Sequence, residues 1–105
     1  ASIGSNDLTQ YLSAADRMNP EVAAYYKSDS TAMLRLLGFV FREFSKREKE
    51  ISVCGEMAGN PETAQLLVGL GARKLSMSSG NIAGVKAKLA ECALQELTAL
   101  AEKKL

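Results

Sequence analysis

Val53-Cys-Gly-Glu-Met-Ala-Gly59 determines the fold prediction, because it joins a short apolar strand to a glycine-rich turn and the start of a helix. The thiol of Cys54 stands at the end of that strand, and nothing else in the 105 residues looks so much like a reaction site. A structural interpretation competes with this one. Cysteine is among the most often buried residue types, and an isolated strand cysteine is usually inert.

Three short strands are expected to alternate with helices along the chain. They are Ala1–Ser5, Ile51–Cys54 and Lys74–Met77. This alternation predicts an α/β fold in which the strands pair in parallel through right-handed crossovers. Three parallel strands make a poor domain, since parallel sheets are normally covered on both faces and contain more strands. The pattern therefore indicates a portion of a larger sheet or barrel.

Helical patterns fill the chain between and after these strands. Apolar residues recur at helical spacing from about Thr31 to Arg47, and Ser30 or Asp29 would cap this helix. Asn60-Pro61 is a strong start for another helix, which ends near Leu70. Further helices are expected at Leu8–Ala15, at Pro20–Tyr26 and, as one continuous element, from about Ile82 to the end of the chain.

Composition excludes several classes of function. Thirteen basic and twelve acidic side chains leave a net charge of +1, so no electrostatic field favours nucleic acid or a membrane surface. No apolar run reaches the roughly 20 residues that span a bilayer. Cys54 and Cys92 lie far apart, which favours free thiols in a reducing cytosol. The chain contains no histidine, which excludes Ser-His, Cys-His and His-metal chemistry within it.

The chemically suggestive residues all follow strand ends. The carboxyl ends of parallel strands meet at one edge of a sheet, so these side chains are expected to converge there. They are Asn6 and Asp7 after the first strand, Cys54 and Glu56 at the second, and Ser76 and Ser78 at the third. Each also has a structural interpretation: Asn6 and Asp7 suit a helix N-cap, and the serines suit a loop.

Several separate motifs resemble the phosphoenolpyruvate-utilising enzymes, in particular the phosphoenolpyruvate-protein phosphotransferases of the Enzyme I type. They are Ser2-Ile-Gly-Ser-Asn-Asp-Leu-Thr-Gln-Tyr11, Asp16-Arg17, Val53-Cys-Gly-Glu-Met-Ala-Gly59, Gly69-Leu-Gly71 and Leu75-Ser-Met-Ser78, in the family's order. The resemblance covers nearly the whole chain. It implies that residues 1–105 are the C-terminal portion of a (β/α)₈ TIM barrel, a partial domain with about three parallel strands.

The same resemblance implies roles for individual residues. Asp7 would be a Mg²⁺ ligand, and Asn6 and Asp7 would contact phosphoenolpyruvate, with Asn6 at the phosphate. Arg17 would pair with that phosphate. Cys54 would be the acid that protonates the enolate carbon as the phosphoryl group passes to a histidine. That histidine, and the contact with a phosphocarrier protein, would lie on an N-terminal domain that precedes Ala1.

Two hypotheses from different classes follow. The first is a fragment of a phosphotransferase that is inactive on its own and forms homo-oligomers. The second is a stand-alone, non-catalytic dimerisation or interaction module derived from the same barrel. A long reading frame upstream of Ala1 would favour the first hypothesis, and a gene that begins just before Ala1 would favour the second.

Overall fold

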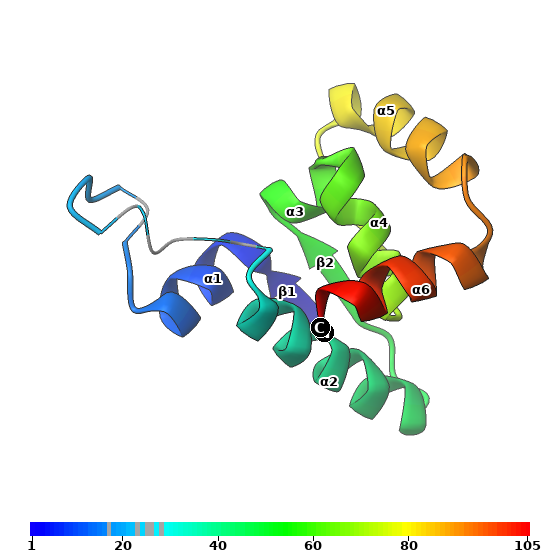
Figure 1. The fold of residues 1–105 in the computed structure, drawn as a ribbon, viewed down its shortest axis with the longest axis horizontal. Helices are drawn as coiled ribbons and strands as arrows, with labels where there is room; N and C mark the ends of the chain where they lie inside the picture. Colours follow the sequence, from blue (N-terminus) through cyan, green and yellow to red (C-terminus); the bar gives the residue numbers. More distant parts are fainter. Residues whose placement is uncertain (17, 23, 25–26, 28) are drawn as a thin grey trace.

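The computed structural model describes residues 1–16, 18–22, 24, 27 and 29–105, and Figure 1 shows the arrangement of their helices and strands. The elements in chain order are β1 (Ser2–Gly4), α1 (Ser5–Ser13), α2 (Thr31–Lys46), β2 (Ser52–Cys54), α3 (Glu56–Gly59), α4 (Pro61–Leu70), α5 (Ser79–Ala90) and α6 (Leu94–Lys104). This mixture of helices and parallel strands confirms the α/β class. No helix in the described ranges is long and apolar enough to cross a membrane.

The predicted parallel pairing is confirmed. β1 and β2 pair in parallel, with Ile3 opposite Val53 and Gly4 opposite Cys54. The third expected strand, Lys74–Met77, is reduced to a single parallel bridge between Val53 and Leu75. Two hydrogen bonds make this bridge: the Val53 N–H donates to the Lys74 carbonyl at 3.0 Å, and the Ser76 N–H donates to the Val53 carbonyl at 2.9 Å. In the described chain this segment has a strand neighbour on one side only.

The helix α2 contributes more residues to the core cluster than any other element, as its apolar spacing predicts. The Ser30 hydroxyl accepts a hydrogen bond from the Met33 N–H at 3.2 Å, so the capping prediction is confirmed and the helix begins at Thr31. The fully buried side chains of its inner face meet those of β2, α3 and α4. This core cluster includes Met33, Leu34, Leu37, Phe41, Val53, Met57 and Leu67.

The start and the end of α4 also agree with the sequence. The Asn60 side chain accepts hydrogen bonds from the Glu62 and Thr63 N–H groups, and Pro61 is the first helical residue. The helix ends at Leu70, before Gly71. Both boundaries depend on residues within one turn, which explains why a local pattern predicted them.

The expected continuous C-terminal helix is wrong, because the chain turns between α5 and α6. The expected helix would carry Val85 and Leu97 on one apolar face, and both are buried, but they belong to different helices. The turn lets α6 pack closely on α4. A Cβ atom at Gly69 would touch the Leu97 carbonyl and lie 2.9 Å from the Ala101 Cβ. Tertiary packing at this glycine therefore outweighs the local periodicity.

The first helix also differs from its prediction. It begins at Ser5, directly after β1, rather than at Leu8. Asn6 and Asp7 therefore lie in its first turn, and the N-cap position belongs to Gly4, which makes no side-chain capping bond. The N-cap interpretation of Asn6 and Asp7 is thus wrong. The short helix expected at Pro20–Tyr26 falls partly on residues outside the described ones.

Candidate functional site

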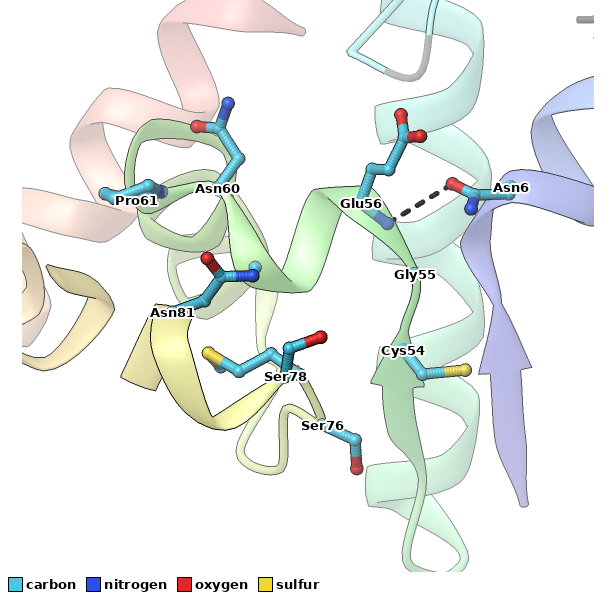
Figure 2. A pocket seen from close by; sticks show the side chains of 11 residues that line it. Asn6, Cys54, Gly55, Glu56, Asn60, Pro61, Ser76, Ser78 and Asn81 are labelled. Atoms are coloured by element: carbon cyan, nitrogen blue, oxygen red, sulfur yellow. Dashed lines mark hydrogen bonds between the residues drawn. The ribbon is translucent and has the colours of Figure 1, made fainter. Parts of the chain in front are cut away.

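A pocket of about 790 Å³ opens beside the carboxyl ends of β1 and β2, and Figure 2 shows the side chains around it. Its lining comes from five separate parts of the chain: the start of α1, the end of β2 with the turn after it, the junction of α3 and α4, the segment after the Leu75 bridge, and the first turn of α5. The polar residues among these are Asn6, Glu56, Asn60, Ser76, Ser78 and Asn81. Cys54 lines the same pocket, so the predicted convergence of strand-end residues is largely confirmed.

Asn6 connects the two strand ends. Its Oδ1 accepts a hydrogen bond from the Glu56 N–H at 3.2 Å, which is drawn in Figure 2. The side chain of Asn6, in α1, thereby holds Glu56, the first residue of α3, and α3 is the helix that follows the glycine turn. An amide that is fixed in this way presents one orientation to the pocket.

The thiol of Cys54 is half-buried and points toward β1 (Figure 2). Its Sγ donates to the Ile3 carbonyl at 3.4 Å, a contact that only the protonated thiol can make. On the other side of the residue, the Cys54 carbonyl accepts a hydrogen bond from the Ser5 hydroxyl at 2.7 Å. Both the main chain and the side chain of Cys54 are therefore attached to the β1–α1 corner.

Asp7 does not share this pocket. Its side chain is exposed and lines a separate hollow of about 330 Å³ together with Gln10, Tyr11 and Asp16. Consecutive helical residues differ in direction by about 100°, so a helix that begins at Ser5 turns Asp7 away from Asn6. Arg17, the other predicted substrate-binding residue, lies outside the described residues.

The carboxylates of the described residues do not form a complete metal site. Within the described residues there is no group of three or more Cys, Asp or Glu side chains that could hold a metal ion. Asp7 by itself offers oxygen atoms of the kind that Mg²⁺ prefers, and Mg²⁺ sites commonly combine one or two carboxylates with water and substrate oxygens. Asp7 therefore fits the role of one Mg²⁺ ligand, and the described residues do not supply a complete Mg²⁺ site.

Asn81 and Ser5 were not predicted as residues of the site, and Asn60 was predicted only as a helix cap. Asn81 lines the pocket from the first turn of α5 because that helix begins at Ser79, earlier than the expected Ile82. Ser5 is completely buried and reaches Cys54 across the two strands. Its position directly before Asn6, at a strand end, was the only available signal.

The sequence of this α/β domain matches the family model described as "PEP-utilising enzyme, PEP-binding domain" over residues 1–94. The chain belongs to this family, and the resemblance stated from its motifs is confirmed. Curated relatives are similar to nearly all of it. A multiphosphoryl transfer protein of Xanthomonas campestris is 47% identical over 104 residues, which are 99% of this chain and 12% of the relative.

Two further relatives carry names from the same system. The phosphoenolpyruvate-dependent phosphotransferase system protein of Salmonella typhimurium is 43% identical over 99% of this chain and 14% of its own length. The phosphoenolpyruvate-protein phosphotransferase of Geobacillus stearothermophilus is 42% identical over 96% of this chain and 18% of its own length. The chain thus spans less than a fifth of the length of each of these relatives.

Proposed function

We propose that this chain is the C-terminal part of the phosphoenolpyruvate-binding TIM barrel of a cytoplasmic phosphoenolpyruvate-protein phosphotransferase. The intact protein would bind phosphoenolpyruvate with Mg²⁺, pass the phosphoryl group to a histidine on another domain, and then pass it to a carrier protein for sugar uptake. One observation carries the proposal: Asn6 and Cys54, from separate parallel strand ends, line one pocket in a chain of this family.

In this proposal each residue has a separate task. Asn6 and Arg17 bind the phosphate of phosphoenolpyruvate, and Cys54 gives its proton to the enolate carbon when the phosphoryl group leaves. The thiol is a suitable acid because its S–H is a proton donor, and its hydrogen bond to the Ile3 carbonyl is weak enough to be given up at little cost. Asp7 supplies one oxygen ligand of Mg²⁺, which when bound stabilises negative charge on the substrate oxygens.

The test compares the intact protein with the 105-residue chain. With phosphoenolpyruvate and Mg²⁺, the intact protein is expected to release pyruvate and acquire a phosphohistidine, measured by a coupled assay and by mass spectrometry. The isolated chain is expected to release none, since it contains no histidine to accept the phosphoryl group. Pyruvate formation by the isolated chain, or none by the intact protein, would refute the proposal.

Asp7 can be tested in the same assay with a matched control. Asp7→Asn should raise the Mg²⁺ concentration that half-saturates turnover, because the substitution removes one anionic ligand. Asp16→Asn removes a carboxylate from the same hollow and should leave that concentration unchanged. Equal effects of the two substitutions would remove Asp7 from the metal site.

The second candidate, a non-catalytic interaction module, is favoured by the strand edges. β1 and the Leu75 bridge each have a strand neighbour on one side only in the described chain. Unpaired strand edges promote association, so we expect the isolated chain to form dimers or larger oligomers. Light scattering at increasing concentration measures this directly. A monomer at high concentration would overturn the expectation.

A further inference from the structure

We propose that Ser5 is a positioning residue that holds Cys54 at the edge of the pocket through the Cys54 carbonyl. The contact stands on the structure alone, whereas its effect on catalysis rests on the proposed function. Ser5 does not line the pocket, so its role is to act through Cys54.

The Ser5 hydroxyl is enclosed and has one well-defined partner. Its side chain is fully buried, and Oγ donates to the Cys54 carbonyl at 2.7 Å, a short hydrogen bond. A Cβ atom at Gly55 would touch this same oxygen, so the turn after β2 lies directly against it. The space around the hydroxyl therefore leaves it little freedom to find another acceptor.

The main chain of Ser5 is itself held in place. One turn along α1, the Thr9 hydroxyl donates to the Ser5 carbonyl at 2.7 Å, and Thr9 is also fully buried. The first turn of α1 thus forms a fixed base, and the Ser5 side chain extends from that base to β2. Ser5 and Asn6 then hold the two residues on either side of Gly55.

Two contacts act on Cys54 together. Ser5 fixes the orientation of the peptide group that follows Cys54, and the Ile3 carbonyl holds its thiol at 3.4 Å. Without the hydroxyl, only the weak S–H contact and the strand pairing would restrain the residue. The Cys54 thiol must reach the enolate carbon to donate its proton, so the reaction is sensitive to small shifts of Cys54. Small misplacements of reacting groups reduce the rate by large factors.

The first experiment measures the thiol itself and needs no activity. In the intact protein, Cys54 and Cys92 are alkylated with iodoacetamide, and the rates are followed peptide by peptide, with the half-buried Cys92 as internal reference. Ser5→Ala is expected to raise the ratio of the Cys54 alkylation rate to the Cys92 alkylation rate by about three- to tenfold, which is the size of effect expected from the loss of one buried hydrogen bond. Ser5→Thr keeps the hydroxyl and should restore the original ratio.

Thr9→Val is the matched control. It removes a buried hydroxyl with a hydrogen bond of the same length from the same helix, but that hydroxyl does not reach Cys54. The alkylation ratio of this variant should rise less than that of Ser5→Ala, because Ser5 keeps its own hydrogen bond to the Cys54 carbonyl and loses only the support of its main chain. If Thr9→Val raises the ratio as much as Ser5→Ala does, the effect is a general loosening of α1 and the proposal is wrong. An unchanged ratio in Ser5→Ala also overturns it.

The second experiment tests the catalytic consequence. Ser5→Ala should lower kcat for pyruvate release by about tenfold or more, with KM for phosphoenolpyruvate nearly unchanged, because the proton donor rather than the binding group is displaced. If Ser5→Ala is too unstable to purify, Ser5→Cys gives the same comparison, since a thiol fills the position but donates weakly. A raised alkylation ratio with unchanged kcat would contradict the catalytic role alone, and an inactive unaltered protein would contradict the proposed function alone.

Discussion

Replacing Cys54 by alanine in the intact protein should reduce pyruvate release by a factor of about 10² to 10⁴, the usual contribution of a positioned general acid. Phosphoenolpyruvate should still bind, because the phosphate contacts assigned to Asn6 and Arg17 remain. Cys54 is the candidate because the residue lines the pocket and its thiol is a proton donor, which makes a hydrogen bond to the Ile3 carbonyl. Steady-state pyruvate release and equilibrium dialysis with phosphoenolpyruvate measure the two quantities separately.

Cys92→Ala is the control for this substitution. Cys92 is also a free, half-buried cysteine, but it lies between α5 and α6 and does not line the pocket. Its replacement should leave turnover unchanged. The fold should survive Cys54→Ala, because the lost S–H contact is a weak one. A Cys54→Ala protein with normal steady-state turnover would show that another group donates the proton.

The local features of the fold could be predicted from the sequence, and the long-range ones could not. Ser30 and Asn60 cap helices within one turn of themselves, so their patterns are complete in a few residues. The break between α5 and α6 depends on the approach of Leu97 to Gly69, two residues that no local pattern relates. Helical spacing placed Val85 and Leu97 correctly on the buried sides of their own helices, but the single continuous helix that it predicted across the break was wrong.

The candidate site likewise has some features that the sequence predicted and others that it did not. The positions of Asn6 and Cys54 at two strand ends predicted that these residues would lie close together, because parallel pairing places the carboxyl ends of both strands at the same edge of the sheet. The role of Ser5 depends on the register that places Gly4 opposite Cys54, which relates two segments far apart in the sequence. The direction of Asp7 depends on a helix that starts at Ser5, a boundary that periodicity places only approximately.

Gly55→Ala should be the most destabilising single substitution at the site. Gly55 has φ 98° and ψ −173°, a backbone region that glycine alone adopts readily. A Cβ atom there would also touch the Ser5 Oγ and lie 3.3 Å from both the backbone N and the Oδ1 of Asn6. Strain of about 1–3 kcal/mol and overpacking of similar size should add, which is a large part of the stability of a small domain.

The same substitution should disable the pocket, because the clashing atoms are the two that hold Cys54 and Glu56 in place. Urea unfolding of the intact protein measures the loss of stability, and phosphoenolpyruvate binding measures the loss of the site. Gly80→Ala is the control: it lies in α5, nothing stands within 4 Å of its added Cβ, and alanine favours a helix by about 0.5–1 kcal/mol over glycine. If Gly55→Ala unfolded at the same urea concentration as Gly80→Ala, the turn after β2 would not need a glycine. The close contacts of Ser5 and Asn6 with this turn would then not restrict the residue at position 55.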